Sequence, residues 1–128
     1  MPSFPTLHEL NNLGDLLKYE ADQRFSRERV TLASGQNLAL GTVIAIDDAT
    51  DQITQLDPDA ITSVNKAAGV LLDACDATSA ANPDALIVAR QAIVARNAVV
   101  WPAGITAPQQ ALAEAQLKAL GILVRQAA

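Results

Sequence analysis

The tetrapeptide Ile-Val-Ala-Arg occurs twice within the stretch 86–102, once at residues 87–90 and again at residues 93–96. The two copies are six residues apart, so equivalent side chains point to the same face of an extended strand. In a helix they would lie about 120° apart, which favours the strand. The repeat therefore predicts a central strand or a hairpin. Trp101, the only tryptophan, and Pro102 follow it and predict a fixed corner.

Three further segments predict strands of the same body. The clearest is residues 41–46, which an acidic turn at residues 47–51 connects to a returning strand at residues 52–56. Together they predict a hairpin. Residues 67–75 are apolar enough to form a strand buried on both faces, and residues 122–125 predict a short last strand.

One helix is predicted near the C-terminus, between Thr106 as its cap and Gly121 just after its end. Pro108 in the first turn agrees with this start. We expect an alanine row to face the sheet, with larger leucine anchors beside it. Glu114 is placed to form an ion pair with Lys118. Two glutamines lie either at the margin of the leucine face or in a subunit contact. These residues are Ala111, Ala115 and Ala119; Leu112, Leu117 and Leu120; and Gln109 and Gln116.

The predicted fold class is α+β, mainly β, with residues 30–128 as the body and residues 1–29 as an extended N-terminal arm. Residues 19–29 are rich in charge and contain a single large apolar residue, Phe25, so this segment cannot bury enough apolar surface to order itself alone. We expect the arm to be mobile in the free protein. It is either a frayed tail or an arm that binds a partner, and its deletion should leave the body folded.

The composition bounds the class of protein. A chain of 128 residues is enough for one domain. Its net charge of −5 argues against a nucleic-acid partner. We expect no membrane span, because no run of about 20 apolar residues exists, and no signal peptide. The single cysteine, Cys75, fits a protein made in a reducing cytoplasm.

Few residues suggest chemistry. His8, the only histidine, lies in the arm and is expected to be solvated, and Cys75 is expected to be a small core residue rather than a nucleophile. The glycines at 35, 41 and 69 form no phosphate-binding fingerprint, and no zinc spacing exists. These patterns predict no catalytic residue, no cofactor and no metal site, and thus a protein that is not an enzyme.

Acidic and basic pairs leave two weaker possibilities open. The cluster Asp47, Asp48 and Asp51 lacks the order of a calcium loop and is expected to be a solvated turn. Asp73 and Asp76 flank Cys75 as strand-end caps or as an acid pair. Arg90 and Arg96 would share one strand face, which is either ion-paired or able to bind an anion.

Four segments resemble, in the right order, the head decoration proteins of tailed phages and prophages, relatives of the lambda capsid-stabilising protein D. The first is Phe25–Leu38, which resembles the family's SRE-VT-ASGQNL segment. The others are residues 67–71 with 76–78, Val100–Thr106, and Leu117–Arg125. The resemblance runs from about residue 19 to residue 125, and although no single motif is decisive, the ordered set is specific.

The resemblance implies a small β-clip-like protein that sits as homotrimers on the outer surface of the expanded phage head and stabilises it. The implied partner is the major capsid protein, and the implied location is the virion. The resemblance also implies that the arm orders by pairing with capsid strands. We place this capsid-binding arm at Tyr19, Phe25, Ser26, Arg27, Glu28, Arg29, Val30 and Thr31, and a trimer or capsid contact, or else a core plug, at Trp101 and Pro102.

Two other functions remain open from the residues. The first is a small-ligand-binding or enzymatic β-domain that uses Asp73, Asp76, Arg90 and Arg96, which would need a pocket lined by these side chains. The second is a generic oligomerisation module. Neither implies nucleic-acid or membrane binding.

Overall fold

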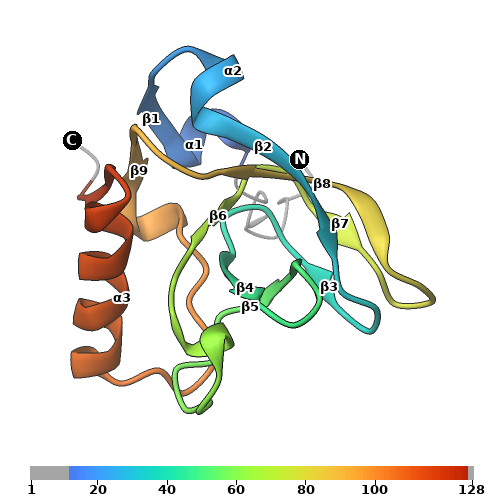
Figure 1. The fold of residues 1–128 in the computed structure, drawn as a ribbon. Coiled ribbons are helices and arrows are strands. Elements are labelled where there is room, and N and C mark those ends of the chain that lie inside the picture. The colour runs from blue at the N-terminus through green and yellow to red at the C-terminus, as the bar shows by residue number, and fades with distance from the viewer. Residues whose placement is uncertain (1–11, 127–128) are drawn as a thin grey trace, which may run out of the picture.

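The computed structural model describes residues 12–126 and shows a mainly β protein with one long helix near its C-terminus (Figure 1). The mainly β fold class with a C-terminal helix is therefore confirmed. In chain order the elements are α1 (Leu13–Leu16), β1 (Leu17–Glu20), α2 (Gln23–Ser26), β2 (Arg27–Leu32), β3 (Asn37–Leu38), β4 (Val43–Asp47), β5 (Gln52–Gln55), η1 (Ser63–Asn65), β6 (Gly69–Leu71), β7 (Cys75–Asp76), β8 (Asn82–Val88), β9 (Ala92–Ala95), η2 (Arg96–Ala98), α3 (Ala107–Ala119) and β10 (Ile122–Arg125).

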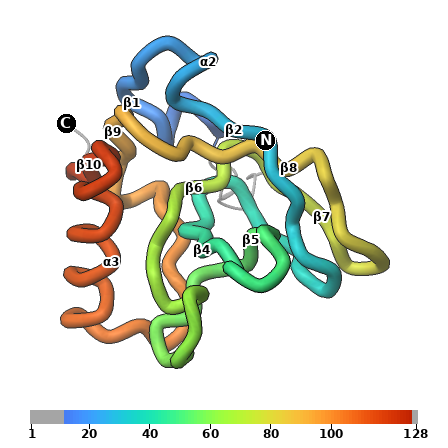
Figure 2. The backbone as a smooth tube through the Cα atoms, viewed as in Figure 1, coloured from blue at the N-terminus to red at the C-terminus, as the bar shows by residue number. Residues whose placement is uncertain are grey.

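The strands form a closed barrel and a smaller sheet beside it. The barrel has the order β2-β5-β4-β6-β8, and the three-stranded sheet has the order β1-β9-β10. The short strands β3 and β7 pair with each other. The predicted hairpin is confirmed as β4 and β5, which pair antiparallel with Ile46 opposite Ile53. Figure 2 shows how the chain leaves the barrel after β8 and continues into β9 beside α3.

Two hydrophobic clusters form the core, and adjacent residues of one strand contribute to different clusters. Val43, Val70 and Val88 belong to the cluster that also contains Leu117 of α3. Their neighbours Ile44, Leu71 and Ile87 belong to the second cluster, which contains Leu32 and Ile53. This alternation is the two-residue period of a β-strand. Both faces of the central strands are therefore buried, which a chain with few aromatic residues achieves with Val, Ile, Leu and Ala.

The helix α3 begins and ends as predicted. Thr106 caps it, since its Oγ1 accepts a hydrogen bond from the Gln109 amide at 3.2 Å while Gln109 Oε1 accepts from the Thr106 amide at 3.0 Å. Gly121 follows it with φ of +85°, a left-handed conformation that favours glycine. The last strand, β10, is confirmed with its predicted bounds and runs parallel to β9.

The predicted faces of α3 are right only for the Leu117 anchor, which is completely buried; the alanine row does not face the body. Its buried residues are Ala113 and Leu117, whereas the alanine row at 111, 115 and 119 is exposed and Leu112 is 60% exposed. Only a narrow stripe touches the body, because the helix lies at one side of the molecule and packs mainly on β10 (Figure 1). The glutamines at its margin contact the same chain: Gln116 accepts from the Ala67 amide at 2.8 Å, and Gln109 donates to Asp59 at 2.8 Å.

The repeat at 87–96 is not one strand, and it is not a hairpin. Its first copy ends β8 in the barrel, and its second copy begins in β9, which pairs with β1 and β10. The chain turns between the copies, where Gln91 adopts φ of +54°. Residues 67–75 also differ from the prediction, because only Gly69–Leu71 forms a strand of the barrel and Asp73 is exposed in a bend.

Residues 12–29 fold onto the body. β1 pairs antiparallel with β9, and β2 pairs antiparallel with β8 from Arg27 to Leu32, so the expected boundary between residues 29 and 30 lies inside a strand. Leu16 of α1 is completely buried. A segment too polar to order alone obtains its backbone partners from the body instead. Residues 1–11, which begin the predicted arm and include His8, lie outside the described part of the chain.

Candidate functional site

Two aromatic side chains lie exposed on the segment that the sequence assigned to partner binding. Tyr19 of β1 is 59% exposed, and Phe25 of α2 is 54% exposed. Monomeric surfaces tolerate single apolar side chains, but aromatic residues are enriched at protein interfaces. These two rings give the segment 17–31 the apolar contacts that a binding surface needs.

A partly buried ion pair holds this segment in place. The Arg27 guanidinium donates to both carboxylate oxygens of Glu20, with Nε at 3.0 Å from Oε2, and the two side chains are 17% and 12% exposed. Ser26 Oγ donates to Glu20 Oε2 at 2.8 Å. The hydrogen bonds from Arg27 hold the pKa of the Glu20 carboxyl below its ordinary value, against the opposing effect of burial. The end of β1 is thereby fixed to the start of β2.

Arg90 fixes the chain around Phe25 to the barrel. Its Nη2 donates to Glu28 Oε1 at 2.7 Å, and its Nη1 donates to the Phe25 carbonyl oxygen. Its guanidinium carbon lies 5.4 Å from the centroid of the Phe25 ring, within the range of a cation–π contact. The Phe25 ring is thus held by contacts on one side while more than half of its surface stays exposed.

The eight residues predicted for the binding arm divide into two groups. Tyr19, Phe25, Glu28 and Arg29 are exposed, and Arg29 Nη1 donates to the Asp84 carbonyl at 3.0 Å. Ser26 is completely buried, and Arg27, Val30 and Thr31 are partly buried. Ser26 and Arg27 anchor the segment through their hydrogen bonds to Glu20, and Val30 packs against the core cluster that contains Leu32.

The two predicted arginines do not share a strand face. Arg90 follows β8, whereas Arg96 begins the short helix η2 and donates to Glu114 Oε1 at 2.7 Å. This contact also corrects the predicted Glu114–Lys118 pair. The hydrogen bond with Glu114 raises the pKa of Arg96. Burial is the largest single effect on Glu114 and acts to raise its pKa, but the hydrogen bonds from Arg96 and Gln110 and the charge of Arg96 together outweigh it, so the pKa of Glu114 is lowered.

Trp101 and Pro102 lie at the corner before α3. The Trp101 ring is half-buried and packs against the core cluster that contains Leu117. Its Nε1 is buried without an acceptor among residues 12–126. Pro102 lies beside Ile105 at the edge of a surface groove. The ring therefore fills part of the core, and the trimer contact expected here stays a prediction.

The remaining chemical candidates have structural explanations. Cys75 is a free thiol that is 7% exposed, and burial raises its pKa, with the nearby carboxylates of Asp84, Asp73 and Asp76 adding to this effect. A thiol in such surroundings is a weak nucleophile. Asp47 accepts from the Ala49 amide within the β4–β5 turn. Within the described part of the chain, no three metal-ligating side chains gather into a site.

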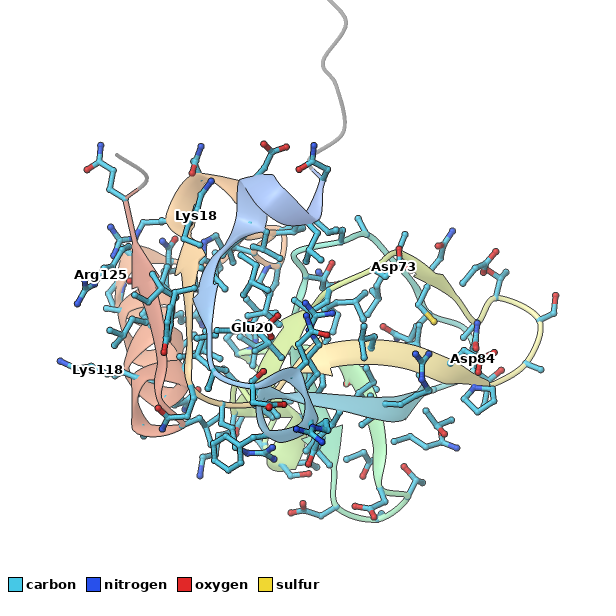
Figure 3. All side chains as sticks on the ribbon, turned by 90° about the horizontal axis from the view of Figure 1, so that it is seen from above. Lys18, Glu20, Asp73, Asp84, Lys118 and Arg125 are labelled. Carbon is cyan, nitrogen blue, oxygen red and sulfur yellow. The ribbon has the colours of Figure 1, made fainter. Side chains whose placement is uncertain are left out.

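The residues of the predicted ligand site are not brought together. Asp73 borders an apolar groove with Leu40 and Leu72. Asp76 lies in another groove, where its carboxylate accepts from the Thr78 amide at 2.9 Å. Figure 3 shows Asp73 and Asp84 on the side of the molecule away from Lys118 and Arg125. The grooves that Asp73 and Asp76 line contain neither arginine, and the cleft that Arg90 lines contains neither aspartate.

Two features of this surface had no signal in the sequence. Glu20 and Arg90 are not among the eight residues expected to bind, although they fix the segment to the body. The seven-residue spacing of Glu20 and Arg27 gave no signal, since the pair forms only because the chain reverses through α2. The sequence also did not predict that β1 is the edge strand of a sheet.

A comparison with models of protein families finds one match that covers nearly the whole chain. The model described as "Bacteriophage lambda head decoration protein D" matches residues 6–122. A search of curated proteins finds no match. Among the helices of residues 12–126, none combines the length and hydrophobicity that a bilayer span requires.

Proposed function

The chain belongs to the bacteriophage lambda head decoration protein D family, which supports a role in phage capsid decoration, and we propose that it binds the outer surface of the expanded head as homotrimers and stabilises the shell. The observation that supports this most directly is the segment 17–31, which is fixed to the body but keeps Tyr19 and Phe25 exposed. In this proposal the partner is the major capsid protein, and no catalysis is involved.

The edge of β1 supports contact through the main chain. β1 pairs with β9 along one edge, and no described strand lies along its other edge. An extended segment of a shell subunit can add to such an edge through main-chain hydrogen bonds. Tyr19 on the same strand would then supply a side-chain contact. In this proposal, the arm that contacts the capsid therefore includes β1.

Three copies of this surface would act together. In a trimer, each bound protomer places the other two near their own sites, and such avidity can exceed the single-site affinity by about 10²–10⁴-fold. A weak contact per protomer is therefore compatible with a stable shell. For the contact between protomers, the corner at Trp101 and Pro102 remains our proposal, with Pro102 as the more accessible of the two because the Trp101 ring packs on the core.

Binding of purified protein to expanded, undecorated phage heads tests the proposal. We compare the wild type with the double variant Tyr19→Ala/Phe25→Ala and with the control Ile61→Ala. Ile61 is 98% exposed, and its loop lies at the end of the molecule opposite α2 (Figure 1). All three proteins should unfold at nearly the same temperature, because exposed side chains contribute little to stability. Loss of head occupancy in the double variant alone supports the proposed surface.

The possible results are distinct. If the wild type does not occupy expanded heads, the decoration role proposed for this chain is wrong. If the wild type and the double variant occupy heads equally, decoration stands and the aromatic segment is not the contact. Equal loss in the double variant and in Ile61→Ala would indicate that the contact does not depend on this surface in particular.

A further inference from the structure

A cleft of about 660 Å³ opens beside the start of β6, the strand that lies between β4 and β8 in the barrel. Such a volume lies within the range of ligand-binding clefts in proteins. Its floor is apolar and includes Ile46, Ala68 and Ile87. Its rim is charged and includes Asp48, Lys66 and Arg90. No local sequence pattern predicts this cleft, because its lining comes from five separate parts of the chain.

One wall of the cleft is an unpaired stretch of strand β4. On the side facing β6, the carbonyls of Thr42 and Ile44 accept from the Leu71 and Ala68 amides at 2.9 and 2.8 Å. Successive residues of a strand direct their backbone groups to alternate sides, so the N–H and C=O of Ile46 face this same side. Gly69 is the last partner of β4 there within the described chain. The Ile46 backbone is therefore open to an incoming strand.

Neighbouring contacts limit the length of this opening. Two residues beyond Ile46, the Asp48 amide donates to Ser63 Oγ at 3.0 Å. The opening is thus bounded by β6 at one end and by the segment around Ser63 at the other. It suits an extended peptide that enters over the apolar floor and pairs with the one N–H and the one C=O of Ile46.

The position of the cleft indicates what fills it. Arg90 lies on its rim and also contacts the exposed Phe25 ring, and Glu28 lines the cleft while it pairs with Arg90. The cleft is therefore continuous with the aromatic surface proposed above to contact the shell. We propose that it receives an extended segment of the major capsid protein, an inference that rests on the proposed decoration function.

The charge of the rim defines this segment further. Arg90 is neutralised by Glu28, whereas Lys66 forms no ion pair within residues 12–126. Lys66 is exposed at the mouth of the cleft and is available to a carboxylate. The segment that fits carries an apolar side chain for the floor and an acidic residue opposite Lys66. Asp48, which also lacks an ion pair in the described chain, would meet a basic residue of the same segment.

Charge reversal at the cleft, with a matched control, tests the inference. Lys66→Glu and Lys118→Glu each reverse an exposed lysine that has no ion pair in the described chain, but Lys118 points outward from α3 (Figure 3). We expect Lys66→Glu to bind expanded, undecorated heads about tenfold more weakly or worse, because like charges would meet across the contact. Lys118→Glu should bind as the wild type does, and both variants should keep their unfolding temperature.

Photo-cross-linking gives a second measurement that does not depend on affinity. A benzophenone side chain at position 66 should attach to the major capsid protein on illuminated heads, and one at position 118 should not. Equal binding by both glutamate variants, or a cross-link from position 66 only to another copy of this chain, would overturn the inference and leave the decoration function intact. Failure of the wild type to bind heads would overturn both.

Discussion

Leu16→Ala is the substitution that best tests whether residues 12–29 belong to the folded body. Leu16 lies in α1, is completely buried, and packs in the core cluster that contains Val94 and Leu117. Truncation of a fully buried leucine removes its transfer free energy and leaves a cavity, which together cost about 2–5 kcal/mol. The expected loss of unfolding free energy is therefore a large part of the stability of a domain of this size.

Urea denaturation followed by circular dichroism measures this loss. With a slope of about 1–3 kcal/mol per molar urea, the midpoint should fall by about 1–3 M while the slope stays unchanged. Leu112→Ala is the matched control, since Leu112 lies on α3 and is 60% exposed, and it should change the unfolding free energy by less than about 0.5 kcal/mol. If Leu16→Ala is as stable as the wild type, this segment is a separate arm in solution and the packing described above is wrong.

The remaining predictions concern the Glu20–Arg27 ion pair and Trp101. Arg27→Ala should lower the unfolding free energy at pH 7 by about 2–3 kcal/mol, because it removes both guanidinium donors, Nε and Nη2, from the partly buried Glu20 carboxylate. Arg24→Ala removes an exposed pair with Asp22 and should have no measurable effect in the same urea titration. Because the folded pKa of Glu20 is lowered, the stabilisation by this ion pair is present above the ordinary carboxyl pKa of about 4.3 and is lost as the pH falls below it. Arg27→Ala should therefore flatten the fall in unfolding free energy between roughly pH 5 and roughly pH 3. An unchanged pH profile would refute this role. Trp101→Ala should cost about 2–4 kcal/mol, since the partly buried ring packs on the core. If the wild type forms the proposed trimers and a Trp101→Ala variant keeps its stability but stays monomeric, Trp101 belongs instead to a subunit contact.

The elements that the sequence predicted well are those with local signals. The cap of α3 follows from Thr106 and Gln109, which bond to each other over three residues, and its end follows from Gly121. The β4–β5 hairpin follows from two β-rich runs around an acidic turn. In each case the residues that determine the structure are close together in sequence, so that a pattern of a few residues was sufficient.

The errors arose where distant parts of the chain decide the structure. The repeat at 87–96 has the even spacing of a strand, but the chain turns at Gln91 and places its copies in different sheets. The face of α3 was predicted from side-chain size, whereas its contact is set by the position of β10 and by the Gln116 bond to Ala67. Spacing within one element carries no information about the neighbour that will cover it.

The candidate site shows the same limit. The polar segment 19–29 was expected to be unable to order alone. In the structure its charges Glu20 and Arg27 pair with each other, and its two ends become strands of different sheets. Deletion of residues 1–29 would remove Leu16, all of β1 and half of β2, so we now expect it to unfold the body, contrary to the expectation from sequence.

Cryo-electron microscopy of expanded heads with and without the purified protein tests the decoration function most directly. We predict added threefold density on the outer surface of the shell, with the segment that contains Tyr19 and Phe25 facing the major capsid protein. Heads that show no added density at saturating protein, or density that contacts the shell only through the outer face of α3, would contradict this account.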